Sequence, residues 1–126
     1  MTQRTDVRCT DLDSLLAEYA DAAMAHRRAS REGNDKVANP AYKRLSSIVQ
    51  ALWMRGAEGR EALLRLLDDP RIEVRGWAAA HALEIAPERA VAVLDELASG
   101  PPSLEEFSAK MVLQQWHAGT FRARGK

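Results

Sequence analysis

Residues 69–83 constrain the fold of this chain more than any other segment. They read Asp-Pro-Arg-Ile-Glu-Val-Arg-Gly-Trp-Ala-Ala-Ala-His-Ala-Leu. The Asp69-Pro70 pair predicts a turn, because proline cannot continue a helix and aspartate can cap the next one. Small and apolar residues then predict a helix from about Arg71 to Ile85 that is apolar on most sides. A helix of that kind is usually a central one with neighbours on several sides.

A similar pattern occurs thirty residues further along the chain. Shifting residues 62–86 by thirty positions aligns apolar positions and a proline-containing turn in both units. The aligned pairs include Leu67 with Leu97, Val74 with Leu104, Trp77 with Phe107, Ala79 with Ala109 and Leu83 with Leu113. A backward shift of thirty-one positions places Ala79 and Leu83 on Ile48 and Leu52, so a first unit fits loosely. Because one helix pair cannot bury its apolar face alone, this self-similarity predicts a stack of helix pairs.

Helix formers dominate the whole chain, and strand signals are nearly absent. We expect six helices: 12–30 capped by Thr10 or Asp11, one from Asn39-Pro40 to Gly56, 58–67, 71–85, one starting at Pro87, and one capped by Ser103. The last helix should turn Leu104, Phe107, Met111, Val112 and Trp116 inward. We therefore predict an all-α fold, a short α-solenoid of about three antiparallel helix pairs. One domain would cover residues 1–126, with flexible ends at 1–10 and 118–126.

Length and charge limit the classes of function. The chain has 126 residues, enough for one domain with a modest core. Lys plus Arg equals Asp plus Glu at 18 each, so the basic excess of a nonspecific nucleic-acid binder is missing. The single cysteine, Cys9, cannot form an internal disulfide. With no apolar run of membrane-spanning length and no signal-peptide pattern, we expect a cytoplasmic protein that does not bind membranes.

The turn, the Val74-Arg75 pair and the small residues after it resemble the second helix of a HEAT-type repeat. The resemblance covers roughly residues 58–116, with the first helix pair as a divergent unit. HEAT-type repeats stack into a right-handed solenoid and usually bind other macromolecules. The chain is also similar to a family of short bacterial HEAT-like domains of unknown function. Some small all-helical bacterial proteins of this kind are thought to be immunity partners of toxins, which the resemblance implies as one role.

In such a solenoid the second helix of each pair lines the concave side. We therefore expect helices two, four and six to form a partner-binding surface through shape and charge complementarity. The candidate contacts are Arg44, Ser47, Gln50, Met54, Arg55, His81, Glu84, Glu105 and Gln114. A solvated, charge-balanced face is the competing interpretation of the basic residues, because Asp11, Asp13, Glu32 and Asp35 are close in sequence.

Arg75 and the tryptophans each have a structural and a functional interpretation. We expect Arg75 to pair with a carboxylate of the Asp68-Asp69 turn, and a binding-surface arginine is the alternative. Trp77 and Trp116 are expected in the core. Trp53 lies at the edge of its helix's apolar stripe, so it is either a core residue or an exposed binding anchor.

No catalytic or metal-binding arrangement is recognisable in the sequence. His81 precedes Glu84 by three positions, but one such pair is a weak metal signal, and a solvated or groove-lining His81 fits better. The adjacent carboxylates Asp68-Asp69 and Glu105-Glu106 stand at turns and helix starts, where capping explains them. Phosphate-binding loops, nucleophile elbows and zinc-protease motifs do not occur. We expect no enzymatic activity, no metal and no cofactor.

Our preferred hypothesis is a non-enzymatic protein–protein interaction module, with toxin-neutralising immunity as one form of it. The first alternative is a nucleic-acid-binding HEAT-like domain, against which the zero net charge and Glu105-Glu106 argue. The second alternative is a homo-oligomeric structural module whose exposed apolar end faces pair between chains.

Overall fold

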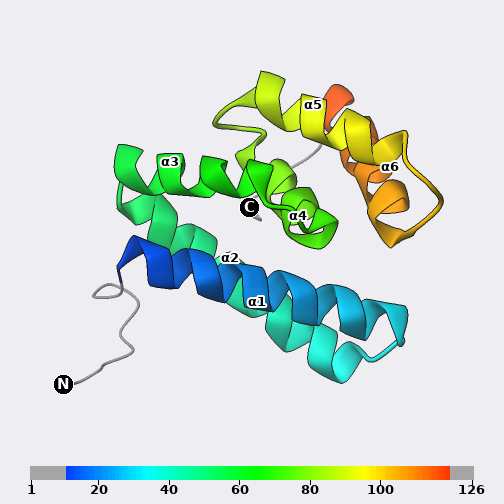
Figure 1. Cartoon of the computed structure of the whole chain (residues 1–126), viewed down its shortest axis with the longest axis horizontal. Helices are drawn as coiled ribbons and strands as arrows, with labels where there is room; N and C mark the ends of the chain where they lie inside the picture. The colour runs from blue at the N-terminus through cyan, green and yellow to red at the C-terminus, as the bar shows by residue number, and fades with distance from the viewer. Residues whose placement is uncertain (1–10, 120–126) are drawn as a thin grey trace. The chain divides into compact units, whose positions relative to one another are not determined.

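The structure is a computed structural model that describes residues 11–119 (Figure 1). Within this range it has six α-helices and no strand, which confirms the all-α prediction. The helices are α1 (Leu12–Arg31), α2 (Asp35–Met54), α3 (Ala57–Arg65), α4 (Ile72–Ala82), α5 (Pro87–Ala98) and α6 (Leu104–His117), and the short 3-10 helix η2 (Leu66–Asp68) follows α3. The chain divides between Leu63 and Leu64 into two compact units. Cys9 and most of the predicted flexible ends lie outside the described residues.

Helices α1 and α2 pack along each other and form most of the first unit (Figure 1). Asp11 caps α1, because its carboxylate accepts a hydrogen bond of 2.8 Å from the Ser14 N–H. Leu15 and Tyr19, which lie four positions apart on α1, are both 0% exposed. Apolar residues at helical spacing therefore form the buried side of α1.

The connection between α1 and α2 covers only residues 32–34, which is shorter than the gap between the predicted helices 12–30 and Asn39-Pro40 to Gly56. Gly33 adopts a left-handed backbone conformation with φ of +68°. The Asn34 N–H donates to the Ala29 carbonyl at 2.8 Å, and the Gly33 N–H donates to the Ser30 carbonyl at 3.1 Å. These two bonds end α1 in the pattern typical of a glycine-terminated helix. The chain then enters α2 almost at once, at Asp35.

The predicted start of the second helix at Asn39-Pro40 was wrong, since Pro40 lies inside α2. Proline removes one backbone hydrogen bond from a helix and crowds the preceding turn. The alanines on either side of Pro40, Ala38 and Ala41, are buried. Helical stability in proteins comes mostly from such packing, so the first turn of α2 persists despite the proline.

Helix α3 approaches the end of α2 closely at Gly59. A Cβ atom placed on Gly59 would lie 1.9 Å from the Leu52 carbonyl oxygen, which no side chain tolerates. The predicted third helix, 58–67, is observed as α3 followed by the 3-10 turn η2. The leucines at its end, Leu66 and Leu67, are buried.

Helix α4 is the central helix of the second unit, as its composition predicted. It packs against η2, α5 and α6. Its small apolar side chains at Val74, Ala78 and Ala79 are 0% exposed. Alanines let neighbouring helices approach closely, which explains why so short a helix can have neighbours on several sides.

The starts of α5 and α6 agree with the sequence, but the inward stripe predicted for α6 is partly wrong. Pro87 is the first residue of α5. The Ser103 hydroxyl accepts a hydrogen bond of 3.0 Å from the Glu106 N–H and caps α6. In contrast, Phe107 is 60% exposed and Met111 is 39% exposed. The buried side of α6 is narrow, so these two apolar residues on the opposite side face solvent.

Candidate functional site

The outward side of α2 carries four of the candidate contact residues. Arg44, Ser47, Gln50 and Met54 are all exposed, and Met54 is 77% exposed. They follow one another at steps of three or four positions, which places them along one side of a helix. The buried residues of the same helix lie on the other side. The first unit therefore presents these four side chains on a helix that its own core holds in place.

The exposed side of α2 is positively charged in its N-terminal half. From Lys36 to Ala57 the sequence contains no carboxylate. Exposed cations occur at Lys36, Lys43 and Arg44. We define the α2 face as Lys36, Lys43, Arg44, Ser47, Gln50 and Met54. The one acidic residue of α2, Asp35, is its first and is exposed beside Lys36, so the charge balance of the alternative interpretation applies to Lys36 more than to Lys43 and Arg44.

Arg55, another candidate contact, is only half-exposed, and its charge influences Asp11 at the start of α1. The pKa of Asp11 is lowered, first by its hydrogen bonds with Ser14 and then by the positive charge of Arg55. Both residues belong to the first unit. We therefore leave Arg55 out of the α2 face.

Trp53 is half-buried, so neither of its two interpretations describes it fully. The Arg60 guanidinium lies 5.9 Å from the centre of the Trp53 ring. A cation at that distance over an indole face is attracted by the ring quadrupole. This contact joins α2 to α3 and gives Trp53 a structural role within the first unit.

His81 and Glu105 are buried, at 4% exposed each, which corrects their assignment to a binding surface. The His81 ring stacks on Trp77 with ring centres 5.7 Å apart. Burial lowers the pKa of His81 to about 4, so the imidazole is neutral at pH 7. The expectation of a solvated or groove-lining histidine was wrong because α4 has neighbours on several sides. Trp77 itself is half-buried.

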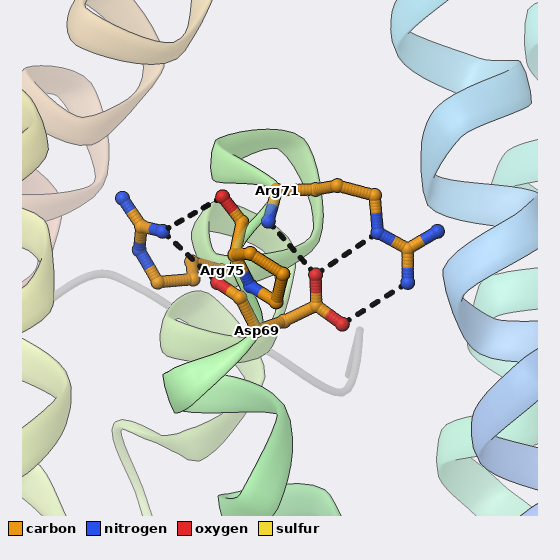
Figure 2. Close-up of polar contacts among 4 residues, drawn as sticks. Asp69, Arg71 and Arg75 are labelled. Carbon is orange, nitrogen blue, oxygen red and sulfur yellow. Dashed lines mark hydrogen bonds and ion pairs between the residues drawn. The ribbon is translucent and has the colours of Figure 1, made fainter.

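The turn before α4 is held by three side chains from residues 69–75 (Figure 2). The Asp69 carboxylate accepts hydrogen bonds from the Arg71 backbone N–H at 2.9 Å and from the Arg71 guanidinium at 3.0 Å. These bonds lower the pKa of Asp69, and the nearby charge of Arg75 adds to the effect. Asp69 thus closes a side-chain turn at Pro70 and does not cap α4, whose N-cap is Arg71.

Arg75 contacts the turn in a different way from the one predicted. Its guanidinium donates to the carbonyl oxygens of Asp69 at 2.9 Å and Pro70 at 3.3 Å (Figure 2). The predicted pairing with an aspartate carboxylate was wrong, because Arg71 already occupies the Asp69 carboxylate. Arg75 instead satisfies carbonyls that the proline-containing turn leaves without a helical partner. Its role is structural, which agrees with the first of its two interpretations.

The remaining candidates, Glu84 and Gln114, are exposed in the second unit. Glu84 follows the end of α4. Gln114 lies on the same side of α6 as Phe107 and Met111, at helical spacing. The sequence did not predict this second exposed face, because the apolar character of Phe107 and Met111 indicated burial.

Residues 11–119 contain no cluster of three or more histidine, cysteine or acidic side chains with metal-binding geometry. No helix in this range is long and apolar enough to cross a membrane. Burial raises the pKa of Tyr19 well above its usual range, so this phenol stays protonated inside the first unit. The α2 face is therefore the candidate site in the described part of the chain.

Comparisons with known proteins extend these observations. A family model described as a domain of unknown function, DUF2019, matches residues 13–116. The fold is similar to the crystal structure of the protein RPA1889 from Rhodopseudomonas palustris CGA009, with a TM-score of 0.85 and 26% sequence identity. That similarity covers 94% of this chain and 98% of the other. No curated protein matches the sequence.

Proposed function

We propose that this chain, which belongs to the DUF2019 family of domains of unknown function, is a non-enzymatic module that binds a partner protein through the α2 face. The exposure of Met54 carries the proposal. A methionine that is 77% exposed leaves a large apolar side chain in water. Methionine is flexible and polarizable, and it is common at binding surfaces that adapt to a partner. Burial of Met54 against a partner would remove this apolar surface from water.

The support beneath the α2 face favours the same function. Leu45 and Leu52, on the opposite side of α2, are almost completely buried. Binding residues on a well-packed helix are held in place before the partner arrives, so less ordering entropy is lost on binding.

We propose further that the helices form a short HEAT-like solenoid of three antiparallel pairs. The thirty-residue repeat, the turn at Asp69-Pro70 and the central position of α4 support this arrangement. A solenoid of this kind would use second helices, α2 among them, for binding. A toxin is one class of partner that this proposal accommodates, and the chain would then act as its immunity protein.

A pair of matched variants tests the proposed surface. Arg44→Glu with Met54→Ala changes the α2 face, and Arg89→Glu with Met111→Ala makes the same two changes at exposed positions of α5 and α6. Each tagged protein is used to capture partners from cells of the source organism, and affinity for the captured protein is measured by calorimetry. We expect the α2 variant to weaken binding at least tenfold and the control to bind like the parent. Equal affinity of the α2 variant and the parent would refute the surface.

A second candidate function is a homo-oligomeric structural module, which the exposed Phe107 and Met111 on α6 favour. Analytical ultracentrifugation distinguishes it from the first. If the chain self-associates through α6, its mass exceeds 14.0 kDa and Phe107→Ser lowers it to the monomer value. A monomer at high concentration leaves protein binding as the supported function.

A further inference from the structure

We infer that the partner segment bound by the α2 face is an acidic stretch of protein, with carboxylates at one end and an apolar residue at the other. This inference rests on the proposed function, because it assumes that the α2 face binds a protein. It adds the chemical class of the partner and its direction along α2.

The charge evidence is the absence of carboxylates within four positions of two exposed cations, Lys43 and Arg44, while the third, Lys36, follows Asp35. Ion pairs between helical side chains form across three or four positions. The positions at that spacing from Lys43 are occupied by Asn39, Pro40, Ser46 and Ser47, all uncharged. No ion pair to Lys36, Lys43 or Arg44 is present among residues 11–119. The cations of this face therefore have their charge available to a partner.

Exposed cations of the second unit differ in this respect. Arg71 pairs with Asp69 at 3.0 Å, and Lys110 pairs with Glu106 one helical turn away. Arg89 lies 3.9 Å from an Asp68 carboxylate oxygen. Arg71, Arg89 and Lys110 thus each have a carboxylate within 4 Å, whereas Lys43 and Arg44 of the α2 face have none among residues 11–119.

The arrangement along α2 gives the partner segment a direction. Lys36 and Lys43 are two helical turns apart, about 10 Å, with Arg44 next to the second of them. Met54 lies eleven residues beyond Lys43, about 16 Å further along the helix. Ser47 and Gln50 between them are neutral hydrogen-bonding groups. A complementary segment has carboxylates opposite the N-terminal half of α2, polar residues in the middle and an apolar side chain over Met54.

The same arrangement favours protein over nucleic acid. A nucleic-acid strand presents phosphates at regular short intervals and requires cations along the whole contact. The C-terminal half of the α2 face offers Gln50 and Met54, which do not neutralise phosphate. Cations confined to one end match a protein segment whose charge is also confined to one end.

Selection of helical peptides provides the test. A displayed library of 18-residue helical peptides, randomised along one side, is selected on the immobilised full-length chain at low salt. We expect the selected peptides to be enriched in Asp and Glu at one end and in Leu, Met or Phe at the other. Their affinity should fall at least tenfold in the Lys43→Glu, Arg44→Glu variant, and the charge-matched control Arg89→Glu, Lys110→Glu should bind like the parent. The variants' helicity is checked by circular dichroism.

The other outcomes separate the inference from the proposed function. Peptides that lose affinity in Met54→Glu but carry no acidic excess would overturn the acidic partner and leave the α2 face as a protein-binding surface. Peptides that bind all α2 variants like the parent would overturn both. A 20-nucleotide single strand that binds the α2 face more tightly than any selected peptide would overturn the inference in favour of nucleic acid.

Discussion

Helices α2 and α4 correspond to each other in the predicted repeat, yet they have opposite relations to solvent. The side chains of α4 are mostly buried, and His81 is buried with them. Helix α2 buries one side and exposes the other, from Lys36 to Met54. The most recognisable motif of the chain thus lies in the helix that packs, because close packing restricts residue type most strongly. The helix that matches the repeat only loosely carries the exposed α2 face.

This contrast predicts that substitutions in α4 lower the stability of the fold and that substitutions on the α2 face change it little. A buried apolar side chain contributes through removal of its surface from water and through close packing. Shortening an exposed apolar side chain changes little of the surface buried from water and few packing contacts. Measurements of unfolding free energy on matched substitutions therefore compare the two helices directly.

The largest effect is expected for Leu83→Ala at the end of α4. Leu83 is 0% exposed, so its truncation leaves a cavity in the second unit. We expect the free energy of unfolding to fall by about 2–5 kcal/mol. Urea denaturation followed by circular dichroism measures the change. A loss below about 1 kcal/mol would mean that α4 is not the packed centre of the unit.

The second prediction concerns the pH dependence caused by His81. Its pKa is about 4 in the folded chain against an ordinary 6.5, so between these values the unfolded chain binds more protons. Stability should therefore fall as the pH drops from 6.5 to 4 and level off below. A shift of this size corresponds to about 3 kcal/mol.

The control for His81 is His81→Gln, which removes the titration. The pKa of Asp69 is also lowered in the fold, so acid weakens both proteins through that carboxyl. The difference in unfolding free energy between parent and variant isolates the histidine. If that difference is the same at pH 7 and pH 4.5, His81 does not titrate as its burial implies.

Local hydrogen-bonding signals in the sequence predicted parts of this fold well. Ser103 was predicted as a helix cap and Asp11 as one of two candidates with Thr10, and Asp11 and Ser103 each accept the expected backbone hydrogen bond. Each of these hydrogen bonds joins residues only three positions apart, so the local sequence is enough to predict it. The exposed residues of α2 were predictable for a similar reason, because Leu45, Ile48 and Leu52 mark the buried side.

Predictions that depended on neighbouring helices failed more often. Helical spacing tells which residues share a side, but not how many sides a neighbour covers. His81 is buried because α4 has several neighbours, and Phe107 is exposed although its repeat equivalent, Trp77, is half-buried. Pro40 is accommodated inside α2 because packing of the adjacent alanines outweighs a local preference. These outcomes are tertiary effects that a linear pattern does not encode.

The third prediction addresses the turn that leads into α4. Arg75→Ala removes the hydrogen bonds from the guanidinium to the Asp69 and Pro70 carbonyls. Loss of bonds from a charged donor should reduce the free energy of unfolding by about 1–3 kcal/mol. Arg75→Lys, which keeps the charge but not the planar fork, should recover only part of the loss. Full recovery by lysine would show that charge near Asp69 matters and that the carbonyl contacts do not.

The smallest effect is expected for Met54→Ala, the counterpart of Leu83→Ala on the α2 face. Both substitutions remove most of a large apolar side chain. Met54 is 77% exposed, however, and contributes little to the core. Alanine also favours the helix slightly more than methionine does. The free energy of unfolding should therefore change by less than about 0.5 kcal/mol. A loss close to that of Leu83→Ala in urea denaturation would show that Met54 is part of the packing of the chain. Its exposure would then no longer support a partner-binding role for the α2 face.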